Sequence, residues 1–352
     1  MKKLRVGVLF GGRSGEHEIS LRSAESVLGA LDRSRYDVVP IGITRDGKWL
    51  IAREALSLLP PSESVSETFA SGIPVQMAAE PAERHPFDVV FPVLHGPFGE
   101  DGTVQGVLEL ADVPYVGAGV LGSAVGMDKA IMKRLMESAD IPVVPYWSFI
   151  QADTDVFVRD RGQTLPYPVF VKPANLGSSV GITKVATPAG LDAAIAAAAE
   201  FDRKIVVEKG VEAREIELGV LGNDRPIVSV PGEVRPKREF YDYEAKYVTD
   251  DSELLIPASL SEAQVEEAQS LALRTFKVLD CSGLGRVDLL LEKNTGKFFV
   301  NELNTLPGFT SISMYPRLWE ATGIPYPDLI ARLIDLAMER HAQKSRLRTS
   351  YG

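Results

Sequence analysis

The sequence predicts an α/β protein whose C-terminal part has α+β character. The first third alternates short apolar runs with amphipathic stretches, which is typical of a parallel sheet connected by helices. The last third combines several strand-like runs with long helical stretches. At 352 residues the chain is too long for one ordinary core, so we expect two or three domains.

Each part of the chain carries its own periodic signals. In the first third these are strands at 4–10, 38–43 and 89–94 and helices at 21–31 and 103–110. In the middle they are a helix at about 123–137, strands at 167–172, 181–185 and 204–208, and an alanine-rich helix before the last strand. Later signals are a helix opened by a capping-box pattern at Ser261–Gln264 and a terminal helix at 327–341. Residues 62–83 lack periodicity and are expected to form a surface excursion.

Composition excludes several classes of protein. The chain has 45% hydrophobic and 24% charged residues, and no apolar run reaches the roughly 18 residues of a membrane span. A net charge of −10 without a basic stripe argues against binding to nucleic acid. Cys281 is the single cysteine, so no intrachain disulfide can form. The first apolar run is too short for a signal peptide, and we expect a cytoplasmic protein with no membrane partner.

Two strand signals near the C-terminus present candidate metal ligands. They lie at 285–288 and 300–304, and a turn-like segment between them predicts a hairpin. Residues i and i+2 of a strand share a face, so Arg286 projects with Asp288, and Glu302 with Asn304. Pairing centred on the turn places Asp288 opposite Glu302. Two carboxylates and an amide oxygen suit Mg²⁺; the alternative is a sheet surface on which Arg286 forms salt bridges.

Two further segments suggest a nucleotide. The small, glycine-bounded loop at 176–181 could close over phosphates, although a plain hairpin turn would look similar. Lys172 ends a nearly apolar strand, where burying it without an anion is costly. The connection at 204–218 suits an adenine ring, with Glu215 as an acceptor for the ribose, or it is simply a charged link between domains.

These motifs, in this order, resemble those of the ATP-grasp enzymes. In detail the chain resembles the D-alanine:D-alanine ligase family over essentially its whole length. The stretches that carry the resemblance are 10–20, 94–102, 127–129, 241–247 and 301–310. It implies an ATP-grasp fold with an N-terminal parallel α/β preATP-grasp domain. The expected domains are 1–122, which binds the first D-alanine, 123–211, which carries the phosphate loop, and 212–352, which carries a lid at 239–252 and the metal site.

The resemblance also implies a reaction. ATP would activate one D-alanine as D-alanyl phosphate, and the amine of a second would displace phosphate to give D-alanyl-D-alanine for peptidoglycan. Asp288 and Glu302 would bind one Mg²⁺ or Mn²⁺ ion, and Glu302 and Asn304 the other. The residues that the resemblance assigns to ATP are Lys129, Lys172, Ser178, Ser179, Glu208, Lys209, Val211, Glu215, Lys246, Asn301 and Glu302. The family also suggests a homodimer through the N-terminal unit.

The remaining implied roles concern the amino acids. Glu18 would hold the ammonium of the first alanine, unless it is a solvated acid favoured by the helix dipole. His95, at the carboxyl end of a strand, would orient that substrate, unless it is a hydrogen-bonded structural histidine. Arg286 and the Gly308 N–H would stabilise the oxyanion. The other implied contacts are Ser178 and Tyr247, in a hydrogen-bonded set with Glu18, and Ser313 and Met314, at the second carboxylate.

Three alternatives compete with a ligase for two D-alanines. The same fold could accept D-serine or D-lactate as the second substrate, although Tyr247 favours an amine. A nicotinamide dehydrogenase would explain the N-terminal unit, but residues 11–15 do not match G-x-G-x-x-G. A non-catalytic nucleotide-binding protein is expected to lack a ligand, whereas Asp288, Glu302 and Asn304 are all present.

Overall fold

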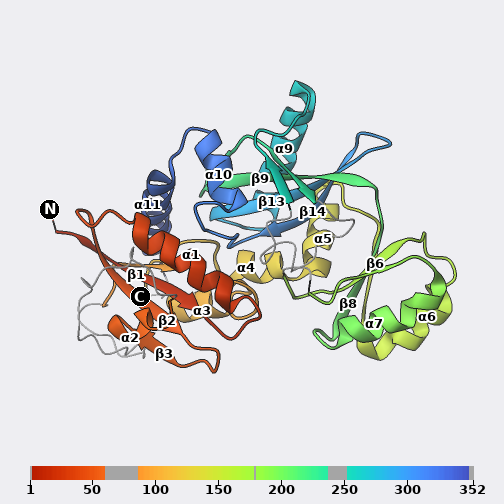
Figure 1. The fold of residues 1–352 in the computed structure, drawn as a ribbon, viewed down its shortest axis with the longest axis horizontal. Coiled ribbons are helices and arrows are strands. Elements are labelled where there is room, and N and C mark those ends of the chain that lie inside the picture. Colours follow the sequence, from red (N-terminus) through yellow and green to blue (C-terminus); the bar gives the residue numbers. More distant parts are fainter. Residues whose placement is uncertain (1, 60–85, 178–179, 237–251, 349–352) are drawn as a thin grey trace.

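The computed structural model describes residues 2–59, 86–177, 180–236 and 252–348, and its elements form three sheets. Figure 1 shows the sheet of β1 and β2 at the end of the molecule that carries the N-terminus and the sheet of β6 and β8 at the opposite end. The six-stranded sheet, which contains β9, β13 and β14, lies between them. The expected surface excursion at 62–83 lies outside the described residues, as do residues 239–251 of the expected lid. No helix in the described part of the chain is both long and apolar enough to cross a membrane.

The first sheet has the predicted parallel core. Its order is β3-β2-β1-β4; β1 pairs in parallel with β2 and β4, while β3 is antiparallel to β2. The strands are β1 (Leu4–Gly11), β2 (Tyr36–Ile43), β3 (Trp49–Ile51) and β4 (Val89–Pro92). The helices of this region are α1 (His17–Ala30), α2 (Arg53–Leu56) and α3 (Thr103–Leu110). The parallel arrangement brings the carboxyl ends of β1 and β4 to one edge, where ligands of such sheets bind.

The second sheet is antiparallel, with the order β5-β8-β6-β7. Its strands are β5 (Tyr146–Ile150), β6 (Val169–Pro173), β7 (Thr183–Val185) and β8 (Lys204–Lys209). The helices α6 (Thr154–Arg161) and α7 (Leu191–Ala199) follow 3-10 turns at Gln151–Asp153 and Pro188–Gly190. Both helices contribute to an apolar core with this sheet, in which Phe157 and Ile195 are buried together with Val171 and Val207.

The single helix predicted at 123–137 is wrong, because the chain forms two helices there. Helix α4 (Val120–Met127) ends before Asp128, and α5 (Lys129–Ser138) begins directly after it. Asp128 has an extended backbone, and its side chain accepts hydrogen bonds from Ala130 N at 3.1 Å and Ile131 N at 3.0 Å. Lys204 forms an ion pair with the same carboxylate. Lys129 therefore becomes the first residue of a new, capped helix.

The third sheet contains the predicted hairpin. Its order is β12-β11-β9-β13-β14, with β10 also paired to β9, and all its pairs are antiparallel. The strands are β9 (Ala213–Gly222), β10 (Ile227–Val228), β11 (Gly232–Pro236), β12 (Ser252–Leu255), β13 (Gly283–Glu292) and β14 (Phe298–Asn304). Asp288 lies opposite Glu302, as predicted, and Arg286 lies opposite Asn304. The capping box predicted at Ser261 is confirmed at the start of α9 (Glu262–Val278).

The C-terminal helix connects the third part of the chain to the first. Helix α10 (Met314–Ala321) leads to α11 (Tyr326–Lys344), and Figure 1 shows α11 close to the β1 sheet. Leu329 and Ile330 of α11 belong to the same apolar core as Val8 and Phe91 of that sheet. Near the end of α11, Arg340 donates to Ser282 Oγ at 2.7 Å, to Tyr115 O at 3.1 Å and to Gly117 O.

Replacing Arg340 should therefore weaken the contact of α11 with residues 115–117 and with Ser282. Its guanidinium also lies 4.4 Å from the centre of the Tyr115 ring. We expect Arg340→Ala to lower the free energy of unfolding by about 2–3 kcal/mol, because charged hydrogen bonds and a cation–π contact are lost together. Urea unfolding measures this change. The control is Arg332→Ala, at an exposed position of the same helix; equal losses in both variants would contradict the assignment.

Candidate active site

The hairpin of β13 and β14 gathers the predicted metal ligands beside a partly buried arginine. Arg286 Nε and Nη2 each lie 2.7 Å from an oxygen of Asp288, and Nε is 2.9 Å from Glu217 Oε2. Asn304 Nδ2 donates to Asp288 Oδ2 at 2.9 Å. The arginine salt bridge expected as the alternative is thus present on the same face as the ligand set. Arg286 compensates the negative charge of two neighbouring carboxylates.

The donor chemistry of this face fits a hard divalent cation. Among the described residues, no three His, Cys, Asp or Glu side chains are grouped so as to hold a metal. The predicted set differs from such a group, since it has two carboxylates and the amide of Asn304, whose oxygen and nitrogen exchange places by a simple rotation. Carboxylate and amide oxygens are the ligands that Mg²⁺ prefers. Asp288, Glu302 and Asn304 therefore suit that ion.

Lys129 links the metal-ligand face to the loop that follows β6. Its Nζ donates to Leu176 O at 2.6 Å and lies 3.7 Å from Glu302 Oε2. The residue is buried, and Asp128 fixes its place at the start of α5. One ammonium group thus contacts both the predicted phosphate loop and a predicted metal ligand. The tip of that loop, Ser178 and Ser179, lies outside the described residues, as do Lys246 and Tyr247.

Lys172 has a buried carboxylate as its anion. Lys172 Nζ lies 2.6 Å from Glu208 Oε2, and Lys133 Nζ lies 3.0 Å from Glu208 Oε1. Burial favours a raised pKa for Glu208, but the two lysines outweigh it and hold the pKa below its ordinary value. Burial, aided by the charge of Lys172, lowers the pKa of Lys133. Two ammonium groups sharing one carboxylate leave excess positive charge, which suits a site for a polyanion.

The other predicted ATP residues follow this cluster along the chain. Lys209 ends β8, Val211 lies in the connection to β9, and Glu215 lies on β9 opposite Leu290. Asn301 lies on β14, and its carbonyl is 3.4 Å from Lys133 Nζ. Asn301 thus contacts the buried Lys133–Glu208–Lys172 cluster directly, and Lys209 follows Glu208 on the same strand.

Glu18, expected at the first substrate, lies elsewhere. Its side chain is 60% exposed and pairs with Arg45 at 2.7 Å on the surface of the first unit. Glu16 instead is buried, just before α1 begins. A Cβ atom on Gly96 would lie 2.8 Å from Glu16 Oε2, and one on Gly177 would lie 3.3 Å from it. Residues two apart near a helix start face different directions, so Glu16 is the carboxylate that lies between the β4 loop and the phosphate loop.

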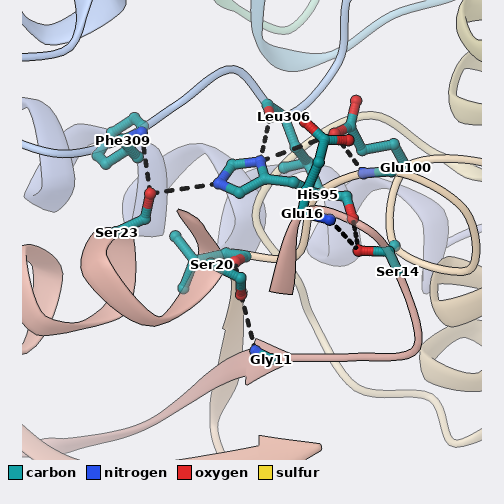
Figure 2. Close-up of polar contacts among 12 residues, drawn as sticks. Gly11, Ser14, Glu16, Ser20, Ser23, His95, Glu100, Leu306 and Phe309 are labelled. Carbon is teal, nitrogen blue, oxygen red and sulfur yellow. Dashed lines mark hydrogen bonds and ion pairs between the residues drawn. The ribbon is translucent and has the colours of Figure 1, made fainter. Parts of the chain in front are cut away.

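His95 lies at the carboxyl end of the first sheet, as predicted, but both its ring nitrogens are engaged by the protein. Nδ1 lies 3.0 Å from Leu306 O and Nε2 lies 3.2 Å from Ser23 Oγ; Figure 2 shows the ring between these two partners. Burial lowers the pKa of His95, but nearby Glu100 and Glu16 outweigh burial and raise it above its ordinary value. His95 therefore joins α1, through Ser23, to the segment that begins at Leu306.

The predicted binding residues after β14 form a compact turn. Ser313 Oγ accepts from Thr310 N at 3.1 Å and lies 2.7 Å from Thr310 Oγ1. A Cβ atom on Gly308 would lie 3.3 Å from Ser313 Oγ, so Gly308 and Ser313 are neighbours. Met314 begins α10 and its side chain is buried. A ligand at this turn would therefore meet its backbone groups and not the side chain of Met314.

The chain matches two known domain families in sequence. Residues 5–118 match the family described as D-ala D-ala ligase N-terminus, and residues 135–335 match the one described as D-ala D-ala ligase C-terminus. The chain belongs to the D-alanine–D-alanine ligase family.

Individual members of the D-alanine–D-alanine ligase family match nearly end to end. The D-alanine–D-alanine ligase of Heliobacterium modesticaldum is 52% identical, with 98% of each chain covered. The solved structure of the D-alanine–D-alanine ligase from Coxiella burnetii has a TM-score of 0.82 and 36% identity, covering 98% of this chain and 97% of that one. VanG D-Ala:D-Ser ligase from Enterococcus faecalis has a TM-score of 0.84 and 36% identity, covering 96% and 100%. The predicted α/β ATP-grasp fold is thus confirmed.

Lys133 is a site residue that the sequence reasoning missed. Lys129, Lys133 and Met136 are spaced for one face of α5, and all three are buried. A lysine at a core position of an amphipathic helix was the available signal, because such a residue needs a buried partner.

Lys133→Met should make acid unfolding begin at a higher pH. The pKa of Glu208 is lower in the folded protein than in the unfolded chain. Its ionised carboxylate therefore contributes fully to the free energy of unfolding at pH values above its pKa in the unfolded chain. This contribution is lost as the pH falls through its pKa in the folded protein. Without Lys133 the pKa of Glu208 in the folded protein is higher than in the parent, so stability begins to fall at a higher pH. Circular dichroism during acid titration measures the midpoint. Arg134→Met, at the exposed neighbouring position, should leave it in place; an unmoved midpoint in Lys133→Met would refute the role.

Proposed function

We propose that the protein joins two D-alanines into D-alanyl-D-alanine through D-alanyl phosphate, releasing ADP and phosphate, as a step in peptidoglycan synthesis. The observation that carries the proposal is the position of Glu16. Its buried carboxylate lies against both Gly96 of the first unit and Gly177 of the phosphate loop. An acceptor for an amino acid's ammonium group thus lies beside the loop expected to hold phosphate. Holding both reactants in place supplies much of such a rate enhancement.

In this proposal Glu16 takes the role first expected of Glu18. ATP is held by positive charge from Lys129 and Lys172, with the remaining contacts as the family resemblance implies: Glu208, Lys209, Val211, Glu215, Asn301, Glu302 and, outside the described residues, Ser178, Ser179 and Lys246. The buried positive charge around Glu208 supports a polyanionic ligand at this place. The first carboxylate attacks the terminal phosphoryl group, and the protein's part is to position both and to neutralise charge.

Two Mg²⁺ or Mn²⁺ ions complete the proposed site, held by Asp288, Glu302 and Asn304. When bound, such ions neutralise the charge on the transferred phosphoryl group. Arg286 lies beside these ligands through its contact with Asp288 and is suited to the same phosphoryl group and to the oxyanion that follows. Lys129, 3.7 Å from Glu302, adds positive charge from the other side.

The second half of the reaction uses backbone donors. The Gly308 N–H is proposed to donate to the tetrahedral oxyanion together with Arg286. The amine of the second D-alanine attacks the acyl phosphate, and its carboxylate is received at Ser313 and the start of α10, where free N–H groups favour an anion. Tyr247 and Ser178, outside the described residues, are proposed to close the site with Glu16 and to help remove the proton of the incoming amine.

D-serine or D-lactate as the second substrate is the alternative. VanG, a D-Ala:D-Ser ligase, is similar in structure at 36% identity. The 52% identity to a D-alanine–D-alanine ligase favours D-alanine. Tyr247 also favours an amine over a hydroxy acid.

The proposal includes a domain division, a partner and a location. Three sheets support domains at 1–122, 123–211 and 212–352. Four exposed apolar side chains on α3 and α4 support a homodimer through the N-terminal unit, since a second copy could cover them: Val107, Leu110, Val120 and Leu121. A cytoplasmic location agrees with the use of ATP and with the unpaired, buried Cys281.

Product identification tests the proposed reaction. With ATP, Mg²⁺ and D-alanine alone, the purified protein should form ADP, phosphate and D-alanyl-D-alanine in equal amounts, as measured by chromatography and mass spectrometry. With D-serine or D-lactate added at equal concentration, the dipeptide of D-alanine should remain the main product. Phosphate release without dipeptide would overturn the reaction, and a predominant mixed product would favour the alternative.

A paired substitution identifies the carboxylate that holds the first D-alanine. Glu16→Gln should lower kcat/KM for D-alanine by about 100-fold or more, because a buried charged hydrogen bond to an ammonium is worth roughly 3 kcal/mol. Glu18→Gln should stay within about twofold of the parent, because its exposed pair with Arg45 contributes little. The reverse order of effects would restore the role to Glu18.

A further inference from the structure

Two residues of the first unit hold the chain segment that carries Gly308. His95 Nδ1 is 3.0 Å from Leu306 O, and Phe309 N donates to Ser23 Oγ at 3.4 Å. Ser23 Oγ is also 3.2 Å from His95 Nε2, so the two residues contact each other. Figure 2 shows the arrangement, with Ser23 on α1 and the ring of His95 between Ser23 and the Leu306 carbonyl. Residues 306–309 are therefore bound at both ends by one connected pair.

The direction of each hydrogen bond follows from its partners. A carbonyl oxygen only accepts, so Nδ1 of His95 carries the hydrogen that is donated to Leu306. A backbone N–H only donates, so Ser23 Oγ accepts from Phe309. The Ser23 hydroxyl can either donate to Nε2 or accept from it, which means that neutral and charged His95 both satisfy the network. Glu100 and Glu16 are the acidic groups that face the ring, and both favour its charged form. In that form Nε2 donates to Ser23 Oγ, which still accepts from Phe309 N.

Burial makes these bonds costly to break. Ser23 has no exposed surface, and His95 is 4% exposed. The Phe309 ring packs on Phe91 with centroids 5.6 Å apart, and Tyr326 donates to Phe309 O at 2.6 Å. A buried N–H or C=O that loses its partner costs about 1–3 kcal/mol. The segment is consequently held in one conformation from the first unit on one side and from α11 on the other.

Between the two held residues, Leu306 and Phe309, Gly308 carries the only N–H group. Pro307 has no N–H group, and the Phe309 N–H is bound to Ser23. Gly308, between them, carries the donor that the proposed reaction assigns to the oxyanion. A donor serves an oxyanion only when it is held where the negative charge develops. Fixing the residues on either side of Gly308 fixes the direction of its N–H.

We propose that Ser23 is a positioning residue, which together with His95 fixes the Gly308 N–H for the oxyanion. This inference rests on the proposed ligase reaction. His95 then acts on the chemistry through the Leu306 carbonyl, and Ser23 acts through the Phe309 amide. The first unit thereby contributes to the second half of the reaction, in addition to holding the first D-alanine through Glu16.

Ser23→Ala is the test, with Ser20→Ala as its matched control. Ser20 lies one turn earlier on α1 and is equally buried, but it accepts from Gly11 N at 2.7 Å and donates to Val93 O at 2.5 Å, within the first unit. Ser23→Ala should lower kcat by about 10- to 100-fold, as expected of a displaced donor. Its KM for ATP should change by less than about twofold, since ground-state binding is retained. Ser20→Ala should lower stability while kcat stays within about twofold.

Amide hydrogen exchange provides a readout that does not depend on turnover. Exchange of the peptide containing Phe309, followed by mass spectrometry, should be about tenfold faster in Ser23→Ala than in the parent, and unchanged in Ser20→Ala. Equal losses of kcat in both variants, or a parent-like kcat or parent-like exchange in Ser23→Ala, would overturn the positioning role. If the parent protein made no dipeptide, the ligase reaction would fail instead, whereas exchange would still report whether Ser23 holds Phe309.

Discussion

Two carboxylates held opposite each other at Asp288 and Glu302 set the electrostatic requirement around which the site is built. The antiparallel register of β13 and β14 leaves these side chains on one face, where like charges repel. Arg286 forms an ion pair with Asp288 on the same strand, and Lys129, at the start of α5, forms one with Glu302. Lys129 also donates to the carbonyl of Leu176, so one ammonium group joins the hairpin to the start of the phosphate loop.

Local patterns predicted much of this fold. The turn-like segment and the i, i+2 rule were enough for the hairpin and its register, because both depend on residues close in sequence. The capping box at Ser261 and the parallel strands of the first sheet are local in the same sense. The resemblance to a ligase family extended this to the ATP-grasp fold, which needs long-range information that periodicity does not contain.

The failures have long-range causes. Asp128 interrupts a continuous helical pattern, and Lys204, far along the chain, pairs with the carboxylate that caps the second helix. Glu16 and Glu18 are both acids near one helix start, and only the fold decides which of them faces Gly96 and Gly177. Lys133 is recognisable once its partner Glu208 is seen across the α5–β8 contact. Predicted roles at Ser178, Ser179, Lys246 and Tyr247 stay predictions, since these residues lie outside the described part of the chain.

The short interruption at Asp128 also has a mechanical consequence. Asp128 begins α5 and pairs with Lys204 on β8, while Lys133 within the same helix binds Glu208 at the far end of that strand. These two ion pairs hold α5 to the second sheet at two points, while Met132 and Met136 of the same helix are buried in the core of the third sheet. Helix α5 thus joins the sheet that leads to the phosphate loop to the sheet that carries the predicted metal ligands, and Lys129 lies at the end of this joint.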